Sequence, residues 1–199
     1  MEPSAAAYPA TFTFDPPEKV TNWRPLVNWL LAIPHLIVLY ALRILAQVIG
    51  LLSWFAIVFT GNMPEAFANL QAMWMRYEQR VNVFTLFMRE EYPPFAFATT
   101  PADDGLDPRT RLDVQPVLTD RNRLTVGLRI FYVIPHVIAL IGLGIYAAIL
   151  ALINFFIVLF TGAWNPGMRD TVIKVMRWYV RVEAYFLLLT DEYPPFELN

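Results

Sequence analysis

The chain has no cysteine, only two histidines and little charge, with 16% of its 199 residues being Asp, Glu, Lys or Arg. The absence of cysteine excludes disulfide bonds, thiolate zinc sites and cysteine nucleophiles, and it leaves the redox compartment open. The formal net charge is −2, so the chain has no basic field that would attract nucleic acid. We therefore expect no nucleic-acid partner.

The sequence also lacks the short motifs that carry familiar catalytic chemistry. It contains no Gly-x-Ser-x-Gly, no His-Glu-x-x-His and no phosphate-binding loop. Neither histidine has another His, Cys or carboxylate close to it in the sequence, which disfavours a zinc or iron site. We predict that the protein is not an enzyme and holds no metal or cofactor.

What the chain contains instead is a repeat, because four motifs occur twice, each time 101 residues apart. The pairs are Ile33-Pro34-His35 with Ile134-Pro135-His136, Phe59-Thr60-Gly61 with Phe160-Thr161-Gly162, Arg76 and Arg80 with Arg177 and Arg181, and Glu91-Tyr92-Pro93-Pro94-Phe95 with Glu192-Tyr193-Pro194-Pro195-Phe196. One constant spacing over four motifs indicates a duplicated structural unit. We assign residues 8–95 to unit 1, residues 96–108 to a linker and residues 109–199 to unit 2.

Each unit contains a long apolar run, from about Leu26 to Phe59 and from Ile130 to Phe160. Since a helix of about 20 residues crosses a bilayer, we predict an all-α integral membrane protein of two tandem, pseudo-symmetric units. The segment from Met1 to Phe14 has neither the basic nor the apolar stretch of a secretory signal peptide, so we expect none.

The apolar runs leave two structures open, because each is too long for one upright helix and too short for two complete ones. In the first, a short helix ends near Pro34 or Pro135, and a kinked helix then crosses the membrane. In the second, the run is a helical hairpin that turns near Arg43 or its counterpart Gly144. Arginine favours the headgroups and glycine favours a turn, so we favour the hairpin.

An amphipathic helix is predicted after each Thr-Gly. In unit 1 its apolar residues recur every three or four positions, as on one helix face: Phe67, Leu70, Trp74, Tyr77, Val81, Phe84 and Met88. We expect this helix to lie in the membrane interface with its arginines among lipid phosphates. The predicted lipid- or partner-binding residues are Arg76, Arg80, Arg177, Arg181 and Arg43. For the four repeat arginines, ordinary snorkelling of the side chains to the interface is the interpretation that we favour over a specific grip on lipid phosphates.

The two histidines, His35 and His136, occupy the same position in the two units. If the units place them near a common axis, they could ligate a haem or relay protons. The interpretation that we favour is structural, with each imidazole bonding a backbone group that the adjacent proline leaves free.

Two short segments outside the helices alternate in polarity as strands do. Residues 111–114 align with residues 10–13, and we expect the two segments to pair as a small sheet. Equivalent motifs should share one environment, so we predict that the units are parallel and that both copies of Glu-Tyr-Pro-Pro-Phe lie on the cytoplasmic side. Inverted repeats, as in some transporters, are the alternative.

The motifs Ile-Pro-His, Phe-Thr-Gly and Tyr-Pro-Pro-Phe together resemble the DUF4389 domain, a family of actinobacterial membrane proteins of unknown function. The resemblance covers about residues 8–95 and 109–196. It implies a bacterial membrane protein in two tandem copies and supplies no catalytic or binding residue. Unit 2 has Thr125-Val126 where unit 1 has Arg24-Pro25, so its first helix should begin less sharply.

With no reaction indicated, we predict a multi-pass protein of the plasma membrane that acts as a non-catalytic accessory or scaffold subunit. It would bind membrane lipids and a partner membrane complex. The alternative is a lipid or small-molecule carrier with a cavity between the two units.

Overall fold

The computed structural model describes residues 8–100 and 102–199. Residues 1–7 of the segment in which we expect no signal peptide, and Pro101 of the linker, lie outside the described residues. The elements along the chain are β1 (Ala10–Phe14), α1 (Arg24–Leu31), α2 (Ile33–Thr60), α3 (Glu65–Thr85), β2 (Thr110–Val114), α4 (Arg123–Gly127), α5 (Arg129–Thr161) and α6 (Pro166–Phe186).

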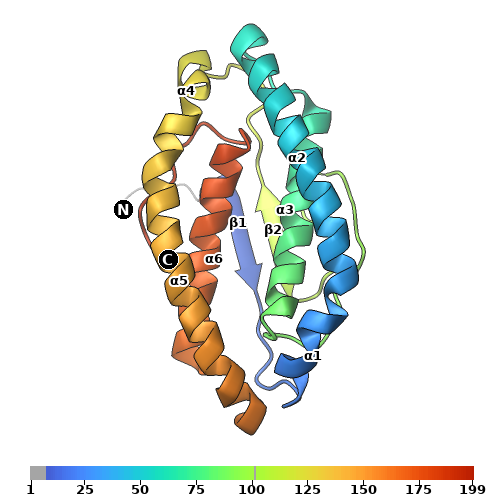
Figure 1. Ribbon diagram of the computed structural model, residues 1–199. Helices are drawn as coiled ribbons and strands as arrows, with labels where there is room; N and C mark the ends of the chain where they lie inside the picture. The colour runs from blue at the N-terminus through green and yellow to red at the C-terminus, as the bar shows by residue number, and fades with distance from the viewer. Residues whose placement is uncertain (1–7, 101) are drawn as a thin grey trace, which may run out of the picture.

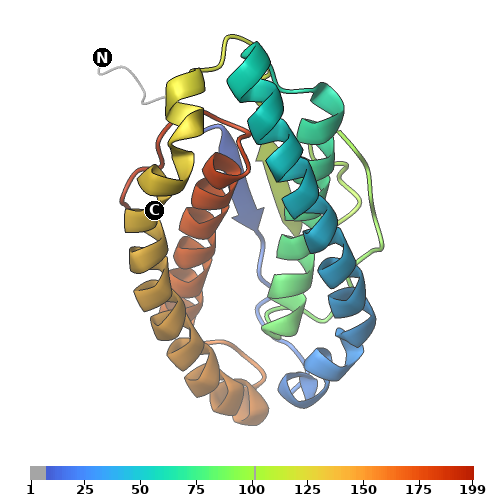
Figure 2. The ribbon, with the colours of Figure 1, turned by 45° about the horizontal axis from the view of Figure 1, so that its top comes forward.

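The elements form three layers that run along one common direction (Figure 1). The two strands form an antiparallel sheet on one side, and α3 and α6 pack on its inner face. The long helices α2 and α5 cover α3 and α6 on the other side (Figure 2). The fold is therefore mostly helical, and the small sheet that the alternating segments predict is present.

The strand pairing shows how the two units are related. Phe12 pairs with Leu112 at the centre of the sheet, and both side chains are buried on the inner face. An antiparallel pair with equivalent inner residues has a local two-fold axis that is perpendicular to the sheet. This pseudo-two-fold axis makes α2 antiparallel to α5 and α3 antiparallel to α6, as Figure 1 shows.

The expected alignment of the strands is wrong by one residue. A spacing of 101 matches Phe12 with Asp113, but Phe12 is buried and Asp113 is exposed. A one-residue shift moves every side chain of a strand to the opposite face. The strands therefore correspond at a spacing of 100, and unit 2 has one more residue between its strand and its helices.

Each long apolar run forms one continuous helix through its centre, so the hairpin that we favoured is wrong. α2 passes through Arg43, and α5 passes through Gly144, without a turn. Both helices end at a glycine in the left-handed conformation, Gly61 and Gly162. This conformation costs glycine little and stops the helix.

The breaks before the long helices differ between the units. In unit 1, α1 ends before Ala32, and Pro34 lies in the first turn of α2, where its missing amide removes no helical hydrogen bond. In unit 2 the break comes earlier, at Leu128, and Pro135 lies inside α5. Unit 2 lacks the Arg24-Pro25 pair, and α4 has five residues where α1 has eight.

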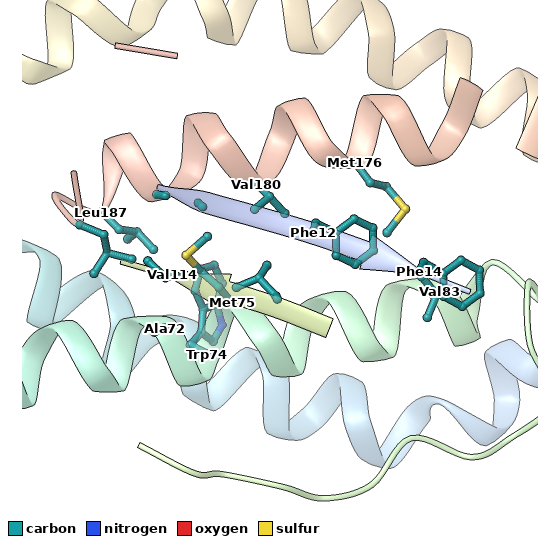
Figure 3. Packing of buried hydrophobic residues seen from close by; sticks show 14 of the residues in the cluster. Phe12, Phe14, Ala72, Trp74, Met75, Val83, Val114, Met176, Val180 and Leu187 are labelled. Carbon is teal, nitrogen blue, oxygen red and sulfur yellow. The ribbon is translucent and has the colours of Figure 1, made fainter. Parts of the chain in front are cut away.

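The amphipathic helices α3 and α6 lie inside the protein, which corrects the expectation that they lie in a membrane interface. Their apolar residues face the inner side of the sheet, and Figure 3 shows Met75 and Val83 of α3, Met176 and Val180 of α6, and Phe12 of β1 in one core. The opposite faces of α3 and α6 are covered by α2 and α5. These helices are the centre of the fold.

The two units exchange their N-terminal segments. β1 of unit 1 packs on α6 of unit 2, and β2 of unit 2 packs on α3 of unit 1. The Val20 amide donates to the Gly162 carbonyl at 2.7 Å, and the Arg121 amide donates to the Gly61 carbonyl at 3.0 Å. Each left-handed glycine that ends a long helix therefore holds the segment that leads into the other unit's helices.

These two glycines provide a matched pair for a stability test. Alanine at either position meets a strained backbone conformation that costs about 1–2 kcal/mol. At Gly162 the new Cβ would lie 2.9 Å from the Val20 carbonyl oxygen, whereas at Gly61 the nearest atoms belong to the flexible Arg123 side chain, at 3.2 Å. We expect Gly162→Ala to lower the thermal unfolding midpoint, followed by circular dichroism, more than Gly61→Ala does. Equal midpoints would contradict the tight exchange contact at Gly162.

Candidate functional site

His35 is buried within unit 1 in an aromatic clasp. Its ring stacks on Phe95 with centroids 4.1 Å apart, and its Nδ1 atom lies 2.6 Å from the Tyr77 hydroxyl. Tyr92 contacts the same ring and donates its hydroxyl to the Leu31 carbonyl. The Tyr-Pro-Pro-Phe motif therefore packs on the histidine of its own unit.

His136 has an equivalent setting in unit 2. Its ring stacks on Phe196 with centroids 4.0 Å apart, and its Nδ1 accepts a hydrogen bond from Trp178 Nε1 at 3.2 Å. Tyr193 donates to the Tyr132 carbonyl, as Tyr92 does in unit 1. The two clasps use the same positions, with Trp178 in place of the equivalent tyrosine of unit 1.

The structure does not bring the two histidines together. Each is near the start of its long helix, and the starts of α2 and α5 lie at opposite ends of the protein (Figure 1). Among residues 8–100 and 102–199 there is also no group of three His, Asp or Glu side chains arranged to hold a metal ion. The two imidazoles are therefore not placed to ligate one group together. The predicted bond is also corrected, because each Nδ1 meets a side chain, Tyr77 or Trp178, and not a backbone group beside the proline.

In unit 1, the predicted lipid-binding arginines are buried beneath the linker. Arg80 forms salt bridges with Asp103 at 3.3 Å and with Asp104 at 2.6 Å. Arg76 donates to the carbonyls of Ala98 and Thr100. Their guanidinium groups fasten the linker to α3 instead of lying among lipid phosphates.

The equivalent arginines of unit 2 are also bonded within the chain. Arg181 is buried and donates to the Glu197 carbonyl at 2.6 Å. Arg177 is half-buried and donates to the Phe12 carbonyl at 3.2 Å. All four arginines that the repeat singles out therefore secure the linker, the C-terminal tail or β1 to the central helices.

Arg43, the fifth predicted residue, lies at a cavity between the two units. The cavity has a volume of about 460 Å³, and all four long helices contribute to its walls. Arg43 and Gln47 of α2 are exposed at its mouth, opposite the exposed Val137 and Ile141 of α5. Its position and size are those of a small-molecule site.

A cluster of polar side chains lies deeper in this cavity. The Tyr179 hydroxyl donates to Glu183 at 2.8 Å and lies 3.4 Å from both carboxylate oxygens of Glu78. Glu183 is only 8% exposed, and its Oε2 atom has no hydrogen-bond partner among the described residues. The cavity therefore holds a buried acceptor that is free to bond a ligand.

Burial makes both carboxyl groups weaker acids than an exposed glutamate. It raises the pKa of Glu78 to about 7 and raises the pKa of Glu183 well above its usual value, with the neighbouring Glu78 adding to the effect. Arg43 acts in the opposite direction on both groups. Two adjacent carboxyl groups with raised pKa values in a cavity are typical of a functional site.

The cluster lies where the pseudo-two-fold axis passes between α3 and α6. Glu78 and Tyr179 are equivalent positions, 101 residues apart, so their contact joins the two units across the axis. The equivalents of Arg43, Gln47 and Glu183 are Gly144, Ala148 and Asn82, and these three line an adjoining cavity of about 340 Å³. The two cavities are pseudo-symmetric, but only one has the charged mouth.

Sequence reasoning missed Glu78, Tyr179 and Glu183. A comparison of motifs that recur in both units passes over them, because each differs from its counterpart in the other unit. One signal was available, since Glu183 is the only ionised residue in the apolar stretch from Val182 to Leu189. An isolated carboxylate in such a stretch needs either a partner or a function.

The raised pKa values predict that Glu78→Gln and Glu183→Gln stabilise the protein near pH 8 and have little effect near pH 4. The pKa of Glu78 rises from 4.5 to about 7 on folding. At pH values between these two, the native state therefore binds more protons than the unfolded state. The free energy of unfolding therefore falls as the pH rises through this range, by at most about 3 kcal/mol for this group.

Thermal unfolding midpoints measured from pH 4 to pH 8 check this prediction. Glu65→Gln is the matched control, since Glu65 is an exposed carboxylate on the same helix as Glu78. If the two cavity variants and the control followed the same pH profile as the unchanged protein, the carboxyl groups would have ordinary acidity.

Comparison with known protein families gives two matches, and both lie on the repeat. The family model described as "Domain of unknown function (DUF4389)" matches residues 22–96 and again residues 123–197. Comparison with curated proteins and with solved structures gives no match. The two matched segments contain the helices of both units and the cavity between them, and together they cover most of the chain, which therefore belongs to the DUF4389 family as a tandem pair of its domains.

Proposed function

We propose that this protein binds lipid and lies on one leaflet of a membrane, with α2 and α5 parallel to the membrane plane. The observation that supports this most strongly is the segregation of exposed side chains to opposite faces of the fold. α2 and α5 are long and apolar enough to cross a membrane, by length and composition. Two orientations of α2 and α5 are therefore compared, one parallel to the membrane plane and one across the bilayer.

The exposed side chains of the long helices are large and apolar. Along α2 the stripe Ile37, Ile44, Val48, Leu52 and Phe59 is exposed, with values of 67% at Ile37 and 71% at Phe59. Three of the five buried residues of the same helix are small or polar, His35, Ala46 and Ser53, and the other two are Ile49 and Ile57. Large apolar groups outside and small or polar groups inside are expected of a helix surrounded by lipid.

The opposite face of the fold is polar. The outward residues of the sheet are Thr11 and Thr13 on β1 and Arg111 and Asp113 on β2. The sheet and the layer of α2 and α5 lie on opposite sides of α3 and α6. One face therefore suits lipid and the other suits water, as in proteins that lie in the membrane interface.

A transmembrane orientation conflicts with this layering. α2 is about 42 Å long at 1.5 Å per residue, and the sheet runs beside the same layers of helices (Figure 1). If α2 crossed the bilayer, exposed Arg111 and Asp113 would be at hydrocarbon depth, at a cost of about 2.5–3.5 kcal/mol each. The open edges of the sheet would also face lipid, which membrane proteins avoid. We therefore propose the flat orientation in place of the expected crossings.

This orientation retains the parallel arrangement of the units. The pseudo-two-fold axis then runs along the membrane normal, so Glu91 and Glu192 lie at the same height on the same side. The location on the cytoplasmic side of the plasma membrane remains a prediction. The role as an accessory or scaffold subunit of a partner complex also remains a prediction. The cavity between the units supports a second role, the binding of a lipid or small molecule.

Nitroxide labels at single cysteines test the orientation cleanly, because the chain has no cysteine of its own. Ile37→Cys, Val48→Cys and Phe59→Cys place labels along one exposed stripe of α2. In vesicles of phosphatidylethanolamine and phosphatidylglycerol, we expect the collision rates with oxygen and with a water-soluble nickel complex to give similar depths at all three positions.

Asp113→Cys, on the outer face of the sheet, is the control and should report water. A profile that is deepest at residue 48 and shallow at residues 37 and 59 would mean that α2 crosses the bilayer. Labels that report water at all four positions would show that the protein does not embed in lipid at all.

A further inference from the structure

The larger cavity contains one guanidinium group and two carboxyl groups, and no salt bridge joins them. The raised pKa values of the carboxyl groups favour their protonated forms, and a bound cation would favour the ionised forms. Arg43 at its mouth forms no salt bridge among residues 8–100 and 102–199. Glu78 and Glu183 lie deeper, and Glu183 Oε2 is a buried acceptor without a partner. A ligand that fits this cavity needs a hydrogen-bonding cation at one end and an anion a short distance away.

The surroundings of the cavity indicate that the ligand also has an apolar part. Val133, Val137, Leu140 and Ile141 of α5 form one wall, and none of them can ionise. The exposed lining residues of α2 and α5, among them Arg43 and Ile141, belong to the helices that we propose to lie in lipid. A molecule that enters from the membrane would therefore bring an acyl chain with it.

We propose that this cavity binds the headgroup of a phospholipid that carries a primary amine. The ammonium group would bond to Glu78 and Glu183, and the phosphate would pair with Arg43. This inference rests on the proposed placement of α2 and α5 in lipid. It specifies which lipid the protein selects.

The adjoining cavity provides a place for the acyl chain of the lipid. It is lined by Gly144, Ala147 and Ala148 of α5, by Leu86 directly after α3 and by the polar Gln79 and Asn82. It shares Glu78, Leu140 and Tyr179 with the headgroup cavity. Small residues at these positions leave the space open, whereas the equivalents of Gly144 and Ala148 in the other cavity are Arg43 and Gln47. The asymmetry gives one headgroup site for each chain.

An anionic lipid without an amine fits less well. Its phosphate could pair with Arg43, but a glycerol headgroup would bring no positive charge to Glu78 and Glu183. A charge-assisted hydrogen bond that only the amine can form corresponds to a preference of about tenfold or more. The structure therefore predicts selection between headgroups and not a general affinity for anionic surfaces.

Native mass spectrometry of the detergent-purified protein tests the selection. Dioleoyl phosphatidylethanolamine and dioleoyl phosphatidylglycerol are offered at equal concentrations, and the bound fraction of each is measured. We expect one phosphatidylethanolamine for each chain, with a preference of about tenfold. Glu183→Gln should remove this preference, Arg43→Gln should weaken the binding of both lipids about equally, and the exposed-carboxylate control Glu65→Gln should leave both unchanged.

Vesicle flotation of the same variants separates this inference from the proposed function. Each variant should still float with the vesicles, because the apolar faces of α2 and α5 are unchanged. Equal binding of the two lipids by the unchanged protein, or a preference that survives Glu183→Gln, would overturn the headgroup site alone. If the unchanged protein failed to float, the membrane placement would fail as well. Should Glu183→Gln not fold, Glu78→Gln carries the test of the preference, since Glu78 is assigned to the same ammonium group.

Discussion

The antiparallel pairing of β1 with β2 is the contact on which the other spatial relations depend. It makes Phe12 and Leu112 neighbours on one inner face and places a pseudo-two-fold axis perpendicular to the sheet. Every helix of unit 1 therefore runs antiparallel to its counterpart in unit 2, within the same layer. The pairing also confines the polar strands to one face and leaves the apolar helices on the other, and this separation is the basis of the proposed flat orientation.

Much of the fold could be predicted from the repeat, because recurring motifs lie at positions with recurring geometry. Gly61 and Gly162 end the long helices as their Thr-Gly motifs indicate, and the alternating segments pair as strands. The hairpin at Arg43 was wrong, since an arginine at a cavity that contains two carboxyl groups needs no turn to avoid hydrocarbon. The strand alignment was wrong by one residue. Unit 2 has one extra residue between its strand and its helices, and only the burial pattern of the strands reveals it.

The candidate site was harder to predict, because it depends on differences between the units and the motifs report their similarities. Arg76, Arg80, Arg177 and Arg181 recur because each unit must secure a loop, a tail or a strand to its central helix. Glu78 and Tyr179 occupy equivalent positions with unlike side chains, and they meet only because the axis passes between them. No spacing rule brings such residues together.

The central claim is that the helices lie in the plane of the membrane, and oriented circular dichroism of the protein in stacked bilayers tests it most directly. α2, α3, α5 and α6 run along nearly one direction (Figure 1), so their signals add instead of cancelling. With light incident along the bilayer normal, the account predicts the spectrum of helices perpendicular to the beam. A spectrum of helices parallel to the beam would contradict the account, because it would place the polar sheet at hydrocarbon depth.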